Sequence, residues 1–159
     1  MPERYERHYL RGMSKSISTS SAPKPVGSYP HAKRVGNLLF LSGVGPRKAG
    51  SGNGDSVVPG LEINDRGEVV KFDFEAQVHS VFANVKAVLD ASGSSWEELV
   101  DVTVFLVNME RDFKPFNRIY AEYFPGGSES RPCRTTVEIN CLPTPIAIEL
   151  KCIATVKNN

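Results

Sequence analysis

The segment FDFEAQVHSVFANVKAVLDASG, residues 72–93, constrains the fold of this chain most strongly. Its apolar residues recur at helical spacing and form one stripe, so they predict an amphipathic helix that buries this stripe against another element. The stripe consists of Phe74, Val78, Val81, Phe82, Val85, Val88 and Leu89. Asp73 and Glu75 suit the N-terminus of such a helix, where backbone N–H groups carry partial positive charge, and Gly93 suits its C-terminal end.

Short alternating patterns on both sides of this helix predict the strands of a sheet. These patterns occupy residues 32–35, 38–43, 61–64, 68–72 and 100–109. The first two surround Gly36-Asn37, a dipeptide typical of tight hairpin turns. The last is apolar on parts of both faces, so we expect it at the centre of the sheet.

A second helix and two further strands complete the predicted fold. Residues 112–124 have a helical stripe made of Phe116, Tyr120, Tyr123 and Phe124. Strand patterns follow in residues 134–141 and 146–152. The order of strands, helix, strand, helix and two strands predicts an α+β fold in which both helices cover one face of a mixed sheet.

Length and composition indicate a single globular domain. A chain of 159 residues with 40% apolar and 23% charged residues can bury one substantial core. Residues 1–25 are charged, then rich in Ser and Thr, then interrupted by Pro, so they predict a flexible tail before a domain at residues 26–157. The Gly-, Ser- and Asn-rich residues 48–60 predict a long loop.

Charge, hydropathy and cysteine spacing argue against several classes of partner. A net charge of +1 gives no sign of a nucleic-acid surface. Apolar runs such as residues 38–41 are far shorter than the roughly 20 residues of a membrane span. Cys133, Cys141 and Cys152 lack C-x-x-C spacing, so we expect reduced thiols in a cytoplasmic protein and no metal site.

Two charged residues stand out in the last two strand patterns. Val137, Ile139 and Cys141 alternate with Arg134, so Arg134 is expected on the polar face of its strand. Glu149 alternates in the same way with apolar residues of the next strand. If these consecutive strands pair, Arg134 and Glu149 lie near each other opposite the helices. Arg134 would bind a carboxylate through its planar fork and Glu149 would hold a water, although solvated surface charges explain the same pattern.

Longer stretches of the chain resemble the Rid/YjgF family of reactive-intermediate imine deaminases. The resemblance covers roughly residues 15–156 and is carried by residues 27–29 (GSY), 39–43 (LFLSG), 84–93, 104–124 and 131–154. The closing R-x-x-V-E, L-P and I-E-x-x-A motifs are specific to that family. The resemblance implies a chorismate-mutase-like α+β fold and a homotrimer, in which three sheets form a central barrel and ligand sites lie in the clefts between subunits.

The resemblance also assigns roles to particular residues. It implies that Arg134 binds the substrate carboxylate and that Glu149 positions the attacking water. Tyr29, Ser42 and Asn117 match the other ligand-binding positions of the family. Thr136 stands where the imine deaminases usually have a cysteine, which argues against general activity on small amino-acid imines.

A narrower resemblance points to one branch of the family. Residues 29–48 and 134–151 are most similar to the 2-aminomuconate deaminases, where an R-T-T segment makes Thr136 a match. We therefore expect hydrolysis of an enamine or imine carboxylate with release of ammonia. Because an imine is already reactive, no metal or organic cofactor is expected. A dicarboxylate would need a second cation, for which Arg47 is the preferred candidate.

Other functions remain open at this point. A general 2-imino acid deaminase would use the same residues, and so would a non-catalytic trimer that binds small carboxylates and regulates a partner. An endoribonuclease activity, which some relatives are described as having, is less favoured because the charge is near neutral.

Overall fold

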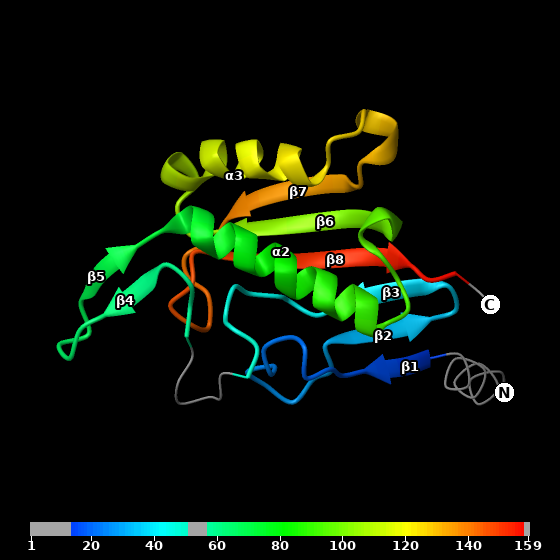
Figure 1. Cartoon of the computed structure of the whole chain (residues 1–159), viewed down its shortest axis with the longest axis horizontal. Helices are drawn as coiled ribbons and strands as arrows, with labels where there is room; N and C mark the ends of the chain where they lie inside the picture. Colours follow the sequence, from blue (N-terminus) through cyan, green and yellow to red (C-terminus); the bar gives the residue numbers. More distant parts are fainter. Residues whose placement is uncertain (1–13, 51–56, 158–159) are drawn as a thin grey trace, which may run out of the picture.

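The computed structural model describes residues 14–50 and 57–157, and it confirms the expected mixed α+β architecture. Two helices lie over one face of a six-stranded sheet, and a separate two-stranded hairpin projects beyond the sheet (Figure 1). The sheet order is β1-β2-β3-β8-β6-β7. The strands are β1 (Ser14–Ile17), β2 (Ala32–Val35), β3 (Leu38–Leu41), β6 (Leu99–Leu106), β7 (Cys133–Glu138) and β8 (Ile148–Thr155), and the hairpin is β4 (Leu61–Ile63) with β5 (Val69–Phe72).

The first predicted helix is confirmed as α2 (Phe74–Ala91). Asp73 caps its N-terminus by accepting a hydrogen bond from the backbone N–H of Ala76 at 3.0 Å. All seven apolar residues of the predicted stripe are buried. They pack on the sheet and on α3 (Met109–Tyr123), so this helix carries much of the core.

The second helix begins three residues earlier than the sequence predicts. Asn108 caps it by accepting a hydrogen bond from the backbone N–H of Arg111 at 2.9 Å. Its buried face includes Phe116 and Tyr120, as expected, together with Ile119. Two 3-10 turns complete the described elements, at Trp96–Glu98 and Ser128–Ser130.

The predicted pairing of the last two strands is wrong. β7 and β8 do not pair, because β6 lies between them, parallel to β7 and antiparallel to β8. The connection from residue 139 to residue 147 carries the chain past β6 before it returns as β8. This central place of β6 agrees with its partly two-sided apolar pattern.

The predicted orientation of β7 is also wrong. Arg134 pairs with Val102 of β6, whose side chain is 2% exposed beneath the helices. Val137 pairs with Phe105 on the other face and is 36% exposed. β7 is an edge strand, so the helices need not cover its apolar residues, and alternation alone does not tell which side faces them.

The sheet begins earlier than the predicted domain boundary. Ser14–Ile17 forms the edge strand β1, which pairs antiparallel with β2, and both Ile17 and Ala22 lie in the core. The domain therefore starts before residue 26, and the first part of the predicted tail, residues 1–13, lies outside the described residues. Residues 51–56 of the predicted loop at residues 48–60 also lie outside the described residues. No helix in the described part of the chain is long and apolar enough to cross a membrane.

The sheet face turned away from the helices, which we call the open face, carries exposed apolar side chains. Leu38 and Phe40 alternate with the buried Leu39 and Leu41, and they are 39% and 38% exposed. Val137 of β7 adds to this surface. A single copy of the chain thus leaves apolar surface in contact with water, which is typical of a face that packs against another protein.

Candidate functional site

A cleft at the start of β8 gathers four of the predicted site residues: Tyr29, Ser42, Arg47 and Glu149. Its walls come from residues 22–31, 42–47 and 143–149, together with Val88 of α2. The cleft encloses about 520 Å³, counting the part open to solvent. Only about 40 Å³ of this space lies inside the walls, so one chain alone does not enclose a whole small organic molecule.

Glu149 lies on the open face, where it pairs with Phe105 of β6. Its carboxylate packs against Gly43, so a Cβ atom at that position would come within 2.7 Å of the carboxyl carbon. Glycine is therefore required here for the close approach. Burial raises the pKa of Glu149 above its ordinary value of 4.5, while the positive charge of Arg47 acts in the opposite direction.

Arg47 is deeply placed in the same cleft and is only 8% exposed. Its Nη2 donates a hydrogen bond to the carbonyl oxygen of Lys24 at 2.7 Å. Its buried Nη1 has no hydrogen-bond partner among the described residues. The guanidinium thus retains a donor that a bound anion would satisfy.

Ser42 and His31 hold the wall of the cleft through backbone groups. Ser42 donates from Oγ to the carbonyl oxygen of Pro30 at 2.7 Å. The His31 ring bonds the carbonyl oxygen of Pro23 through Nε2 at 3.0 Å and accepts from the backbone N–H of Thr19 through Nδ1 at 3.3 Å. With Nδ1 accepting, Nε2 is the donor, and the two bonds connect His31 to residues 19 and 23. Tyr29, which also lines the cleft, is 45% exposed.

The remaining predicted residues form a second group beside α3. The Arg134 guanidinium lies over the ring of Tyr120, 4.6 Å from its centroid, and 5.6 Å from that of Phe116. Thr136 follows on the same face of β7, and its buried Oγ1 has no hydrogen-bond partner among the described residues. Asn117, next to Phe116 in α3, is half-buried.

The structure therefore separates the predicted site into two halves. Val102 pairs with Arg134 on one side and with Cys152 on the other, and Cys152 is 1% exposed under the helices. Glu149 is three residues from Cys152 along β8, so its side chain leaves the opposite face. The prediction that Arg134 and Glu149 share one face of the sheet is wrong, and one chain does not bring them together.

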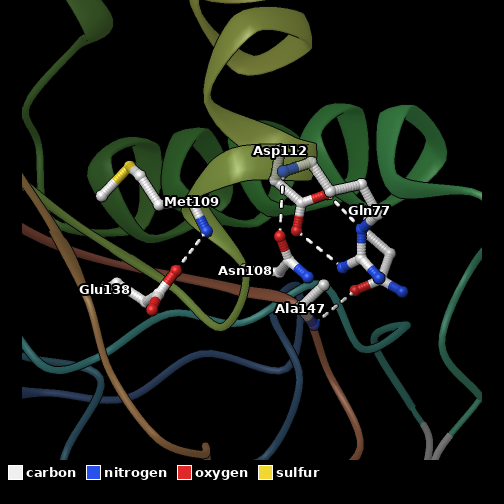
Figure 2. A network of polar contacts seen from close by, with 7 residues as sticks. Gln77, Asn108, Met109, Asp112, Glu138 and Ala147 are labelled. Carbon is white, nitrogen blue, oxygen red and sulfur yellow. Dashed lines mark hydrogen bonds and ion pairs between the residues drawn. The ribbon is translucent and has the colours of Figure 1, made fainter.

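Two backbone contacts fix these halves to the helices (Figure 2). The Oε1 of Gln77 in α2 accepts a hydrogen bond from the backbone N–H of Ala147 at 2.8 Å, two residues before Glu149. Glu138, at the end of β7, accepts from the backbone N–H of Met109 at 2.5 Å, where α3 begins. The sequence pattern did not predict the contact of Gln77 with Ala147 or the packing of Gly43 against Glu149. The Ser-Gly turn marked Gly43 as a turn residue, and no comparable signal marked Gln77.

Comparison with known proteins shows the family to which the chain belongs. Residues 19–156 match the family described as Endoribonuclease L-PSP. A RutC family protein of Pyrococcus horikoshii is 39% identical over 143 residues, which covers 89% of this chain and 98% of the relative. Reactive Intermediate Deaminase A of Arabidopsis thaliana, a chloroplastic protein, is 37% identical over 139 residues, or 87% of this chain and 64% of the relative.

Solved structures show the same fold. Yeast Mmf1 superposes with a TM-score of 0.74 at 30% identity, covering 91% of this chain and 99% of that one. The YjgF gene product of E. coli gives 0.73 at 29% identity, covering 90% and 99%. E. coli TdcF, solved with bound serine, gives 0.73 at 26% identity with the same coverage. The chain belongs to the Endoribonuclease L-PSP family, which is the Rid/YjgF family that its motifs resemble.

Proposed function

We propose that this protein hydrolyses an enamine or imine carboxylate of the 2-aminomuconate type and releases ammonia. The observation that carries the proposal is the Arg134 guanidinium and the half-buried Glu149 carboxylate on opposite faces of one sheet. A plant relative is named as a reactive intermediate deaminase, and a structural relative holds serine, a small amino carboxylate. Both names agree with chemistry on small nitrogen-containing acids.

The two halves would meet between copies of the chain. Arg134, Asn117 and Thr136 of one copy would face the Glu149 cleft of the next, so each site would contain residues of both. The exposed apolar residues of the open face, such as Phe40 and Val137, supply surface that further copies would cover. Any closed ring of copies uses each half once and leaves none unpaired, and the homotrimer implied by the family resemblance is one such ring.

Arg134 would bind and orient the substrate. Its planar fork would donate two parallel hydrogen bonds to the carboxylate beside the imine carbon, and the Tyr120 ring, 4.6 Å from the guanidinium carbon, supports it from one side. Fixing the carboxylate in this way fixes the adjacent electrophilic carbon relative to Glu149 of the other copy.

Glu149 would manage the water and the protons. The substrate reacts as its imine, whose nitrogen takes up a proton from solvent. An ionised Glu149 accepts a proton from the attacking water while the water oxygen bonds to the imine carbon. Glu149 then returns its proton to the amine nitrogen of the tetrahedral carbinolamine. The C–N bond breaks, ammonia leaves, and the hydroxyl releases its proton to solvent as it becomes the carbonyl of the product. A raised pKa suits this two-way role, because it makes the carboxylate a better base.

The test compares two substrates with the purified full-length chain. Ammonia release is measured from 2-aminomuconate and from a simple 2-imino acid generated in the same cuvette, each corrected for spontaneous hydrolysis. We expect faster release from 2-aminomuconate. Preference for the simple imine would favour a general 2-imino acid deaminase. Acceleration of neither reaction, with carboxylates still bound, would overturn the proposal in favour of a non-catalytic carboxylate-binding protein.

A further inference from the structure

Arg47 differs from Arg111 and Arg118, which form ion pairs with carboxylates in the described part of the chain. Arg111 forms a bidentate pair with Asp112, and Arg118 pairs with Glu75 and Glu122. Arg47 is buried, and among the residues that the structure describes it forms no ion pair and its Nη1 has no hydrogen-bond partner. A buried guanidinium is strongly favoured to gain an anionic partner, because burial removes the water that would otherwise solvate it.

The place of Arg47 decides what could partner it. It lines the same cleft as Glu149, close enough that its charge partly offsets the rise that burial causes in the pKa of that carboxyl, yet the two groups form no ion pair. Its Nη2 is held by the carbonyl of Lys24, so the guanidinium is already anchored in one orientation. Nη1 has almost no surface open to solvent, so an anion that enters beside Glu149 would reach it after a small shift of the cleft wall.

We propose that Arg47 binds a second carboxylate of the substrate, so that the cleft selects diacids over monoacids. The inference rests on the proposed function, in which Arg134 of a neighbouring copy holds the carboxylate beside the reacting carbon. The far carboxylate then extends into the Glu149 cleft and pairs with Arg47. Without Arg47, the charge of Glu149 would repel a dianion from this cleft, so Arg47 also offsets that repulsion.

Binding of stable keto acids tests this selectivity apart from catalysis. 2-Oxoadipate and 2-oxohexanoate have the same chain length and differ in the terminal carboxylate. Calorimetric titration of the full-length wild-type protein should show tighter binding of 2-oxoadipate. Arg47→Gln should weaken 2-oxoadipate about 10- to 100-fold, the usual loss for a buried charge-assisted hydrogen bond, and leave 2-oxohexanoate nearly unchanged.

Two further variants separate charge from structure. Lys48→Gln removes the neighbouring positive charge from an exposed side chain and should leave both affinities unchanged. Arg47→Lys keeps the charge without the fork and should retain part of the preference for the diacid. Equal loss of both acids in Arg47→Gln would overturn the proposal, because it would mean that Arg47 only anchors Lys24.

The wild-type comparison alone also overturns the proposal if the two acids bind equally well, whatever the folding of the variants. The outcomes are distinguishable from failure of the proposed function. Arg47-dependent selection of 2-oxoadipate without any ammonia release from 2-aminomuconate would remove the hydrolytic role and keep the diacid site.

Discussion

Arg134 and Glu149 leave opposite faces of the same sheet, with β6 between their strands. Arg134 pairs with the buried Val102, and Glu149 pairs with Phe105 of the open face. A guanidinium and a carboxylate so placed cannot act on one small ligand within one chain. If both serve one reaction, the site must be assembled from two copies, and activity must depend on the assembly.

Replacement of Arg134 should weaken carboxylate binding. Arg134→Ala removes a charge-assisted bidentate contact, so we expect a loss of about 1.5–3 kcal/mol in the binding of a 2-oxo acid, with a matching loss of activity. Arg134→Lys should recover part of it, because a single ammonium lacks the planar fork. Calorimetry measures both. Arg118→Ala, an exposed arginine of α3, serves as the control, and equal losses in both variants would argue against a specific role for Arg134.

Glu149→Gln should slow turnover and leave carboxylate binding intact. Loss of an acid–base group typically costs about 10²- to 10⁴-fold in rate. In the wild type the base form is needed, and burial raises its pKa above 4.5, so the rate should fall as the pH drops through that raised value. A pH–rate profile checks this. A normal rate in Glu149→Gln, or a profile that stays flat down to pH 4.5, would remove Glu149 from the mechanism.

The same pKa shift predicts a cost in stability. The folded state keeps a proton on Glu149 at pH values where the unfolded chain has released it, so stability falls as the pH rises from the unfolded pKa to the raised folded pKa. Glu149→Gln removes this penalty and should unfold at a higher denaturant concentration than the wild type at neutral pH. The difference should disappear below the ordinary value of 4.5, and a variant less stable at neutral pH would contradict the account.

Gly43→Ala should displace the Glu149 carboxylate without unfolding the protein. The added Cβ would meet the flexible end of Glu149, which can move away. We expect a lower kcat, unchanged binding of a 2-oxo acid and little loss of stability. Gly127→Ala is the matched control, since its φ of −66° is ordinary and nothing lies within 4 Å of an added Cβ. Equal kcat in the two variants would show that the position of Glu149 is not limiting.

Gln77→Met should destabilise the strand that carries Glu149. The substitution leaves the buried backbone N–H of Ala147 without an acceptor (Figure 2), which costs about 1–3 kcal/mol. Denaturant unfolding measures the loss. Lys86→Met, on the exposed face of the same helix, should change stability by no more than about 0.5 kcal/mol. A similarly small change in Gln77→Met would mean that this contact contributes little.

The sequence predicted the helices and most strands because their signals are local. The stripe of α2, its Asp73 cap and the Gly36-Asn37 turn each depend on neighbours within a few residues. Asn108 was missed as the α3 cap because it continues an apolar strand pattern without a break. The early start of the sheet at Ser14 was missed because β1 is a short edge strand with one buried side chain.

The site was predicted less well because its geometry is not local. Tyr29, Ser42 and Arg47, which the family motifs and the charge pattern indicated, line the cleft that contains Glu149. The pairing of β7 with β6, rather than β8, depends on how a connection of several residues crosses the sheet, and alternation carries no information about that. The face of Arg134 was inverted for the same reason: Val137 is the more apolar side chain, but α3 covers the other side of the strand.

Mixing two inactive variants tests the shared site most directly. Arg134→Ala and Glu149→Gln are unfolded together, refolded as a mixture, and assayed for ammonia release from 2-aminomuconate. If each site takes Arg134 from one copy and Glu149 from another, random mixing should restore about a quarter of wild-type activity, since one in four subunit boundaries combines the two intact groups. Activity of the mixture no higher than that of either variant alone would contradict a site built from two copies.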